Sequence, residues 1–224
     1  MRPWKTLDTA DTEDGRLELL RRGGEDFLIT IDGRVLMSSM LHKSEVELST
    51  WGCGPVRNRS TPRVLTAGLG LGFTLRAALD ILPASAQVVV AELNPVVVKW
   101  CRGPAAILSD DALSDERVEL VVGDVMDCVR DVGRGVRAPF DAIVIDLYVG
   151  PGPDPGGEYE AVYGDAALAA VRAALTDGGV YAVWGEAQQP EFYESLQRAG
   201  FETSCARPRG PGRRHVIYVG IKPS

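Results

Sequence analysis

The sequence predicts an α/β fold in which helices cover both faces of a mostly parallel sheet. Three observations support this fold. Short apolar β-runs alternate with helical segments from residue 62 onward. The first of these runs ends in a glycine-rich turn over residues 68–72. The 224-residue chain is 45% hydrophobic and 25% charged, a composition that is typical of globular proteins.

The N-terminal region is predicted to form a small unit ahead of this sheet. Residues 1–15 are polar and acidic, and we expect a flexible arm there. Apolar β-runs at 17–21, 27–31 and 34–38, separated by glycine-containing turns, predict a small β-hairpin region, and a helix follows. The expected regions are therefore an arm over 1–15, a β-hairpin and helix region over 16–60, and the α/β domain over 61–224.

Strands and helices alternate through the third region. Strands are expected at 64–67, 88–92, 118–122, 142–146, 180–184 and 216–221. Helices are expected at 74–82, 95–101, 165–175 and 191–199, each with an apolar face or a clear start or stop signal. The Arg-, Pro- and Gly-rich segment 207–214 is expected to be a solvated hairpin turn, with an anion-binding role as the alternative.

The stretch from residue 64 to 94 has the pattern of a nucleotide-binding βαβ unit. Gly68, Gly70 and Gly72 follow the first strand, where the absence of a Cβ lets the backbone turn sharply and lets a ligand approach it. Glu92 ends the second strand about 20 residues later, where a carboxylate can accept hydrogen bonds from ribose hydroxyls. A tight turn with a solvent-facing acid is the alternative, which the amphipathic helix over 74–82 disfavours.

Charge and composition exclude several classes of function. The formal net charge is −7, which argues against a nucleic-acid partner. The sequence has no apolar run long enough to span a bilayer and no signal-peptide core near its start, so we expect a cytoplasmic protein without a membrane partner. The chain has two histidines and four scattered cysteines, so no metal site is expected.

The order of these motifs resembles the class I S-adenosylmethionine-dependent transferases, and within them the spermidine-synthase-like branch. The stretches that carry the resemblance are the loop 68–72, Glu92 with Asn94, residues 117–124, residues 140–146 and, more weakly, residues 175–180. The resemblance implies a Rossmann-like class I methyltransferase fold. It also implies S-adenosyl-L-methionine as the cofactor, with decarboxylated S-adenosylmethionine as the alternative.

The resemblance also assigns residues to the cofactor. The implied cofactor-binding set is Gly68, Gly70, Gly72, Glu92, Leu93, Asp124 and Val125. In this set the carboxylate of Asp124 and the backbone amide of Val125 would meet the adenine. Asp124 also stands before a helical segment, so a helix N-cap is the alternative, and the two roles can coexist.

Asp146, at the end of the fourth strand, is the first catalytic candidate. The resemblance places an aspartate there to deprotonate or orient an attacking amine, and a structural cap of the following loop is the alternative. Tyr148 and Tyr163 are further candidates that could orient the acceptor, with packing under the loop as their alternative. The Gly- and Pro-rich segment 147–157 is expected to gate the substrate.

The acceptor site is predicted less sharply. Candidates are His42, as a base near the hairpins, Glu45, and Glu186 just after the fifth strand. For His42 and Glu186 a plain surface position is the alternative. The partner is expected to be a small-molecule acceptor, and a homodimer is expected from the resemblance alone.

The polyamine-binding residues of the resembled branch are not retained. Leu71 and Val149 stand where that branch has aspartates, Leu36 replaces a glutamine, and Lys43 and Ser44 replace a tyrosine and a histidine, so that only Glu45 survives. An aspartate at position 71 would repel the carboxylate of intact S-adenosylmethionine, and Leu71 would not.

The first hypothesis is therefore methyl transfer from S-adenosylmethionine to a small-molecule nucleophile such as an amine. Aminopropyl or 3-amino-3-carboxypropyl transfer is the alternative. Two other classes stay open: a non-catalytic cofactor-binding partner domain, and a nicotinamide dehydrogenase, which the loop spacing fits less well.

Overall fold

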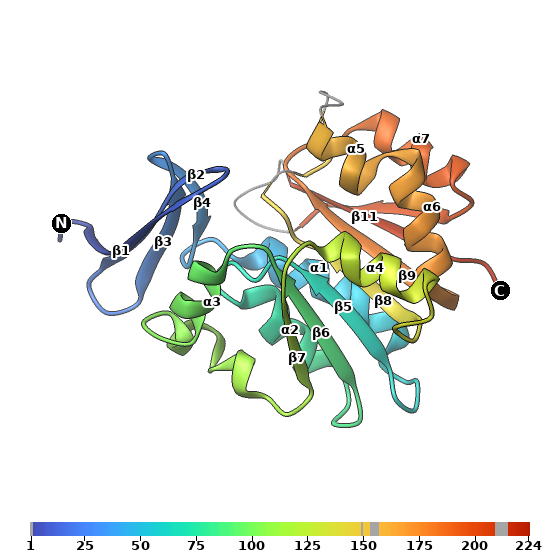
Figure 1. Cartoon of the computed structure of the whole chain (residues 1–224), viewed down its shortest axis with the longest axis horizontal. Helices are drawn as coiled ribbons and strands as arrows, with labels where there is room; N and C mark the ends of the chain where they lie inside the picture. Colours follow the sequence, from blue (N-terminus) through green and yellow to red (C-terminus); the bar gives the residue numbers. More distant parts are fainter. Residues whose placement is uncertain (1, 149, 153–156, 209–214) are drawn as a thin grey trace.

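The computed structural model describes residues 2–148, 150–152, 157–208 and 215–224. These residues form a four-stranded antiparallel sheet at the N-terminus and a seven-stranded sheet with helices on both of its faces (Figure 1). The predicted fold class is confirmed, both in the mostly parallel sheet and in the small β-hairpin region that precedes it. The Arg-rich turn predicted over 207–214 lies largely outside the described residues.

The N-terminal sheet is a meander of four strands in chain order. They are β1 (Lys5–Thr12), β2 (Gly15–Arg22), β3 (Asp26–Ile31) and β4 (Arg34–Ser38). Residues 5–12, expected to lie in a flexible arm, instead pair along β2 from Lys5–Arg21 to Thr12–Gly15. The polar composition of this segment suits an edge strand, because an edge strand has one neighbour and needs no buried face.

The large sheet has the order β10-β11-β9-β8-β5-β6-β7. Its strands are β5 (Arg63–Ala67), β6 (Gln87–Glu92), β7 (Val118–Val122), β8 (Phe140–Ile145), β9 (Leu175–Gly185), β10 (Glu202–Ala206) and β11 (Val216–Ile221). The run from β9 to β7 is parallel, whereas β11 is antiparallel to β9. The sequence did not predict β10, whose polar residues lie at the edge of the sheet.

Seven α-helices and three short 3₁₀ turns are described around these sheets. The helices are α1 (Lys43–Cys53), α2 (Phe73–Ile81), α3 (Pro95–Cys101), α4 (Val125–Gly133), α5 (Gly157–Tyr163), α6 (Asp165–Ala174) and α7 (Pro190–Arg198). Alternate strand residues face opposite layers. Val64 and Val88 belong to the core cluster with α1 and α2, whereas Leu65 and Val89 belong to the cluster with α4, α6 and α7.

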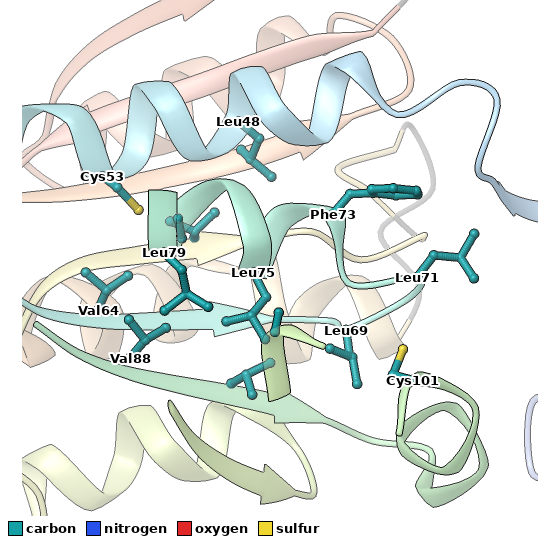
Figure 2. Close-up of a cluster of buried hydrophobic side chains, with 14 of the residues drawn as sticks. Leu48, Cys53, Val64, Leu69, Leu71, Phe73, Leu75, Leu79, Val88 and Cys101 are labelled. Carbon is teal, nitrogen blue, oxygen red and sulfur yellow. The ribbon is translucent and has the colours of Figure 1, made fainter. Parts of the chain in front are cut away.

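Helix α1 packs directly on the large sheet, although the sequence assigned it to the N-terminal region. Leu48 and Cys53 of α1 share a buried cluster with Leu75 and Leu79 of α2 (Figure 2). At Gly52 a Cβ would lie 2.6 Å from Cγ2 of Val144 in β8. Helix α1 is thus one of the helices that cover the large sheet, and the division of the chain near residue 60 stays a prediction.

The strand order determines where a ligand site forms. β5 pairs with β6 on one side and with β8 on the other, so the winding of the sheet reverses between β5 and β8. In open α/β sheets the loops diverge at such a point and leave a crevice at the carboxyl ends of the strands. Those ends also lie next to the N-terminal sheet (Figure 1).

Candidate functional site

The glycine loop joins the carboxyl ends of three strands. Gly68 has φ 82°, and a Cβ at this position would overlap the backbone oxygen of Asp146. Its amide donates to the backbone oxygen of Ala91 over 2.9 Å, and the amide of Asp146 donates to the backbone oxygen of Ala67 over 2.9 Å. Glycine is therefore required at position 68, because the ends of β5 and β8 approach too closely for a side chain.

Glu92 lies buried beneath this loop at the end of β6. Its two carboxylate oxygens accept the backbone amides of Leu69 and Asn94, each over 2.8 Å. Burial raises the pKa of Glu92, and these amide hydrogen bonds oppose the increase. The two hydrogen bonds fix the orientation of the Glu92 carboxylate at the end of β6, beside the glycine loop.

Asp124 precedes α4 and acts as its N-cap. Its Oδ1 accepts the amide of Met126 over 2.8 Å, and its Oδ2 lies 3.5 Å from the guanidinium of Arg130. The side chain is about half exposed, at 45%. The N-cap alternative is therefore realised, and it leaves part of the carboxylate open to a ligand.

Asp146 follows β8 and accepts a hydrogen bond from the hydroxyl of Thr74 in the first turn of α2. Burial and the nearby carboxylate of Glu45 raise the pKa of Asp146 to about 7, and the Thr74 hydrogen bond opposes this increase. A carboxyl group with this pKa can accept and release a proton near neutral pH. The position thus suits the acid–base role that the sequence predicted.

Three adjoining cavities run along the carboxyl ends of the strands. The central cavity, of about 150 Å³, includes Glu45, Glu92 and Asp146 in its lining. The β7-side cavity, of about 300 Å³, is lined by residues that include Leu93, Asp124, Val125 and Tyr163. The β9-side cavity, of about 520 Å³, is lined by residues that include Arg34, Glu186 and His215.

Shared residues make these cavities one continuous trough. Gly68 and Glu92 line both the central and the β7-side cavities. Glu45 and Trp184 line both the central and the β9-side cavities. Tyr148 lines all three, and the guanidinium of Arg34 lies 5.6 Å from its ring centroid. Most of the predicted site residues are thereby brought together.

Two predicted aromatic residues lie in different surroundings. Tyr163 lines the β7-side cavity but is buried, with its ring edge-on to Phe192. Burial raises the pKa of its hydroxyl well above the usual value, which suits packing better than proton transfer. His42 stacks on Phe73 at 4.1 Å and is absent from the described lining of the trough.

Three residues of the glycine loop differ in what they contact. Gly70 lines the central cavity, whereas a Cβ at Gly72 would contact the side chain of Ser109. Leu71 is fully buried in the apolar cluster that Figure 2 shows, and it is not among the residues that line the trough. Leu71 therefore does not face a ligand as the sequence argument assumed. The Val149 argument falls outside the described residues.

Several trough residues have no local sequence signal. Met37 of β4 lines the central cavity, and its sulfur accepts the amide of Leu71 over 2.9 Å. Trp184 comes from β9, Ser44 comes from α1, and His215 directly precedes β11. Only the packing of the N-terminal sheet and α1 against the large sheet brings them to one place, so pattern analysis of single segments could not find them.

Two further searches concern membranes and metals. Among the helices of the described residues, none has both the length and the apolar character needed to span a bilayer. Over the same described ranges, no three or more His, Cys, Asp and Glu side chains are grouped as a metal ion would require.

Comparisons with known proteins agree with this fold. No family model matches the chain. Over 153 residues the chain is 27% identical to a polyamine aminopropyltransferase of Clostridium tetani (strain Massachusetts / E88). This match covers 68% of the chain and 50% of that protein, so the chain aligns with half the length of its curated relative.

Two solved structures share the fold. They are a spermidine synthase from Thermotoga maritima and a spermidine synthase in complex with the transition-state analogue AdoDATO. Each superposes with a TM-score of 0.73 at 18% identity and covers 97% of this chain and 72% of the other. In sequence and fold, the chain is similar to the spermidine-synthase-like branch of the class I S-adenosylmethionine-dependent transferases.

Proposed function

We propose that this chain transfers an aminopropyl group from decarboxylated S-adenosylmethionine to an amine. The observation that carries the proposal is the central cavity, where Glu45, Glu92 and Asp146 meet. The described residues that line this cavity include no lysine, arginine or histidine. Such a site stabilises the cationic sulfonium and ammonium groups of this reaction. The similarity to a polyamine aminopropyltransferase supports the same choice.

The proposal replaces methyl transfer as the first hypothesis. The preference for intact S-adenosylmethionine depended on Leu71, whose side chain is buried in the core and is absent from the described trough lining. The carboxylate of intact S-adenosylmethionine would instead lie near Glu45 and Asp146, without a basic partner in the described central cavity. Like charges so close in a partly buried cavity disfavour binding.

The residues of the β7-side cavity suit the adenosine part of the donor. Glu92 offers a fixed carboxylate for the ribose hydroxyls, and Leu93, 58% exposed, offers an apolar surface for the adenine ring. Asp124 keeps an exposed oxygen for the amino group of adenine. When bound, the donor supplies a sulfonium whose adjacent carbon accepts a nucleophile.

Asp146 supplies the proton transfer in this proposal. An acceptor ammonium gives one proton to the Asp146 carboxylate, and the freed nitrogen lone pair forms the new C–N bond. The electron pair of the broken C–S bond returns to sulfur, so the products are a neutral thioether and a secondary ammonium. Proton transfer by a positioned carboxylate contributes roughly 10²- to 10⁴-fold to the rate.

Product analysis tests the proposal directly. The purified chain is incubated with decarboxylated or intact S-adenosylmethionine and with a panel of monoamines and diamines, and products are identified by mass spectrometry. We expect methylthioadenosine and an aminopropylated amine from the decarboxylated donor. S-adenosylhomocysteine from the intact donor would establish methyl transfer instead. Calorimetric binding of either donor without any product would favour the non-catalytic alternative.

A further inference from the structure

A hydrogen-bonded series of three polar side chains connects the β9-side cavity to the central cavity. Nδ1 of His215 lies 3.2 Å from Oγ of Ser44, and Oγ of Ser44 donates to Oε2 of Glu45 over 2.6 Å. Glu45 lines the central cavity together with Asp146. Ser44 and Glu45 come from α1, and His215 directly precedes β11, so the three residues come from two segments far apart in the sequence.

The middle of this hydrogen-bonded series is shielded from solvent. Ser44 and Glu45 are each only 7% exposed, whereas His215 is partly buried and lies edge-on to Trp184 with ring centroids 4.9 Å apart. Polar groups so deeply buried are ordinarily retained only when they are hydrogen-bonded.

Other charged groups surround His215 and Glu45, the two ends of this hydrogen-bonded series. Arg34 and Glu186 line the β9-side cavity with His215, and Asp146 faces Glu45 in the central cavity. The described lining of the β9-side cavity thus has Arg34 and Glu186 as the charged groups beside His215 and Glu45. One proton route therefore leads from the acidic cavity to a titratable group on the open side.

We propose that His215 is a positioning residue that removes the reaction proton from the central cavity through Ser44 and Glu45. This inference rests on the proposed function, because aminopropyl transfer to an ammonium must release one proton for each turnover. The proton taken by Asp146 passes to Glu45 through water in the central cavity, where both carboxyl groups line a volume of about 150 Å³ that has room for more than one water molecule. Glu45 then passes it along Ser44 to His215.

The hydrogen-bond pattern determines how the transfer occurs. The only hydroxyl hydrogen of Ser44 goes to Glu45, so Nδ1 of His215 donates to Ser44 while Glu45 is ionised. Once Glu45 is protonated, the two bonds reverse. Solvent first exchanges the His215 proton from Nδ1 to Nε2, so that Nδ1 can accept. Glu45 then passes its proton to Ser44 and Ser44 passes its own hydrogen to Nδ1. The imidazolium so formed releases the proton on Nε2, which restores the Nδ1–H form that donates to Ser44. One proton enters this series at Glu45 and one leaves it at His215, and Ser44 gains and loses one hydrogen.

The first test does not depend on activity. The chain contains two histidines, so isotope-labelled histidine gives two ring signals that a His42→Gln variant assigns. We expect the Nδ1 signal of His215 to change its chemical shift in Ser44→Ala, because this variant removes the hydroxyl beside Nδ1. Glu45→Gln should change the same signal by less, because it alters the group to which Ser44 donates, and His42 should not respond. A His215 signal that is identical in the wild type and both variants would overturn the inference.

The second test measures the turnover of His215 variants and its rescue by imidazole. His215→Gln should lower kcat by about tenfold with little change in the KM of the donor, and added imidazole should restore the rate of His215→Ala. A purely structural role would lower protein stability without rescue by imidazole, and that result would refute the relay. If the wild type transfers no aminopropyl group while Glu45→Gln still shifts His215, the proposed function fails and the coupling of His215 to Glu45 stands.

Discussion

Asp146 is the residue on which the proposed chemistry depends. We predict that Asp146→Asn lowers kcat for aminopropyl transfer by about 10²- to 10⁴-fold, because the amide cannot take the ammonium proton. In the wild type the rate should rise with pH through about 7, as Asp146 loses its proton, and this limb should be absent in the variant. Steady-state kinetics from pH 5.5 to about 9 measure both effects.

Donor binding provides the control for this substitution. Calorimetry should find similar donor affinity in Asp146→Asn and wild type, since the variant keeps the shape of the side chain. The exposed Glu194→Gln on α7 serves as a matched acid-to-amide control and should keep the wild-type rate. Full activity of Asp146→Asn would remove this residue from the mechanism.

The same carboxyl group makes stability depend on pH. The folded-state pKa of Asp146, about 7, lies above its unfolded value near 3.8, so the native state favours the protonated form. This contribution to stability is complete below about pH 4 and is lost as pH rises through 7. Relative to the wild type, Asp146→Asn should therefore become more stable by about 2–4 kcal/mol between pH 4 and 8. Urea unfolding at both pH values measures the difference, and a pH-independent difference would contradict the raised pKa.

At the scale of elements, Glu92 joins the glycine loop to the start of α3. We predict that Glu92→Gln weakens donor binding by at least tenfold, because one of its two backbone amide partners loses its acceptor and the ribose loses a carboxylate. Calorimetric titration with decarboxylated S-adenosylmethionine checks this. Asp124→Asn offers a comparison that keeps the N-cap and should cost less affinity.

Helix α1 carries Ser44 and Glu45 to the site by packing closely on the sheet. We predict that Gly52→Ala destabilises the protein by about 1–3 kcal/mol, because its Cβ would meet Val144 at 2.6 Å and Ala182 at 3.2 Å. Gly54→Ala is the matched control, since nothing lies within 4 Å of its Cβ and its φ is −54°. Equal unfolding free energies for the two variants would contradict this close packing.

For the whole molecule, the central cavity lies between the two sheets. Leu17, Ile29 and Met37 of the N-terminal sheet line it opposite Glu92 and Asp146. Donor binding should therefore slow amide hydrogen exchange both in β3 and β4 and in the glycine loop. Hydrogen-exchange mass spectrometry with and without decarboxylated S-adenosylmethionine tests this, and protection confined to the glycine loop would place the donor away from the N-terminal sheet.

Hydrogen bonds join the N-terminal sheet to α3, a helix of the large-sheet region. Oδ2 of Asp8 in β1 accepts hydrogen bonds from Nζ of Lys99 over 2.8 Å and from the indole nitrogen of Trp100 over 2.9 Å. These hydrogen bonds lower the pKa of Asp8. Two expectations stay predictions, namely the homodimer and the small-molecule acceptor.

The fold could be predicted because local patterns carry it. The β-runs of the large sheet, the glycine turn and the carboxylates at strand ends are short-range features whose physical causes are local. Edge strands β1 and β10 escaped prediction, because their polar residues lack the apolar alternation that marks a half-buried strand. Asp146 and Glu92 were placed correctly at strand ends, whereas the proposed role of Leu71 required a side-chain direction that the sequence does not show.

By itself, the sequence determined the fold class and the carboxylates at the ends of β6 and β8, because strand periodicity and turn chemistry act over a few residues. Only the tertiary structure decided what lies around those carboxylates. It buried Leu71 in the core, brought Met37 against the glycine loop, and joined His215 to Glu45 through Ser44. These contacts join segments far apart in the chain, and their geometry follows from the packing of whole sheets and helices rather than from any local pattern.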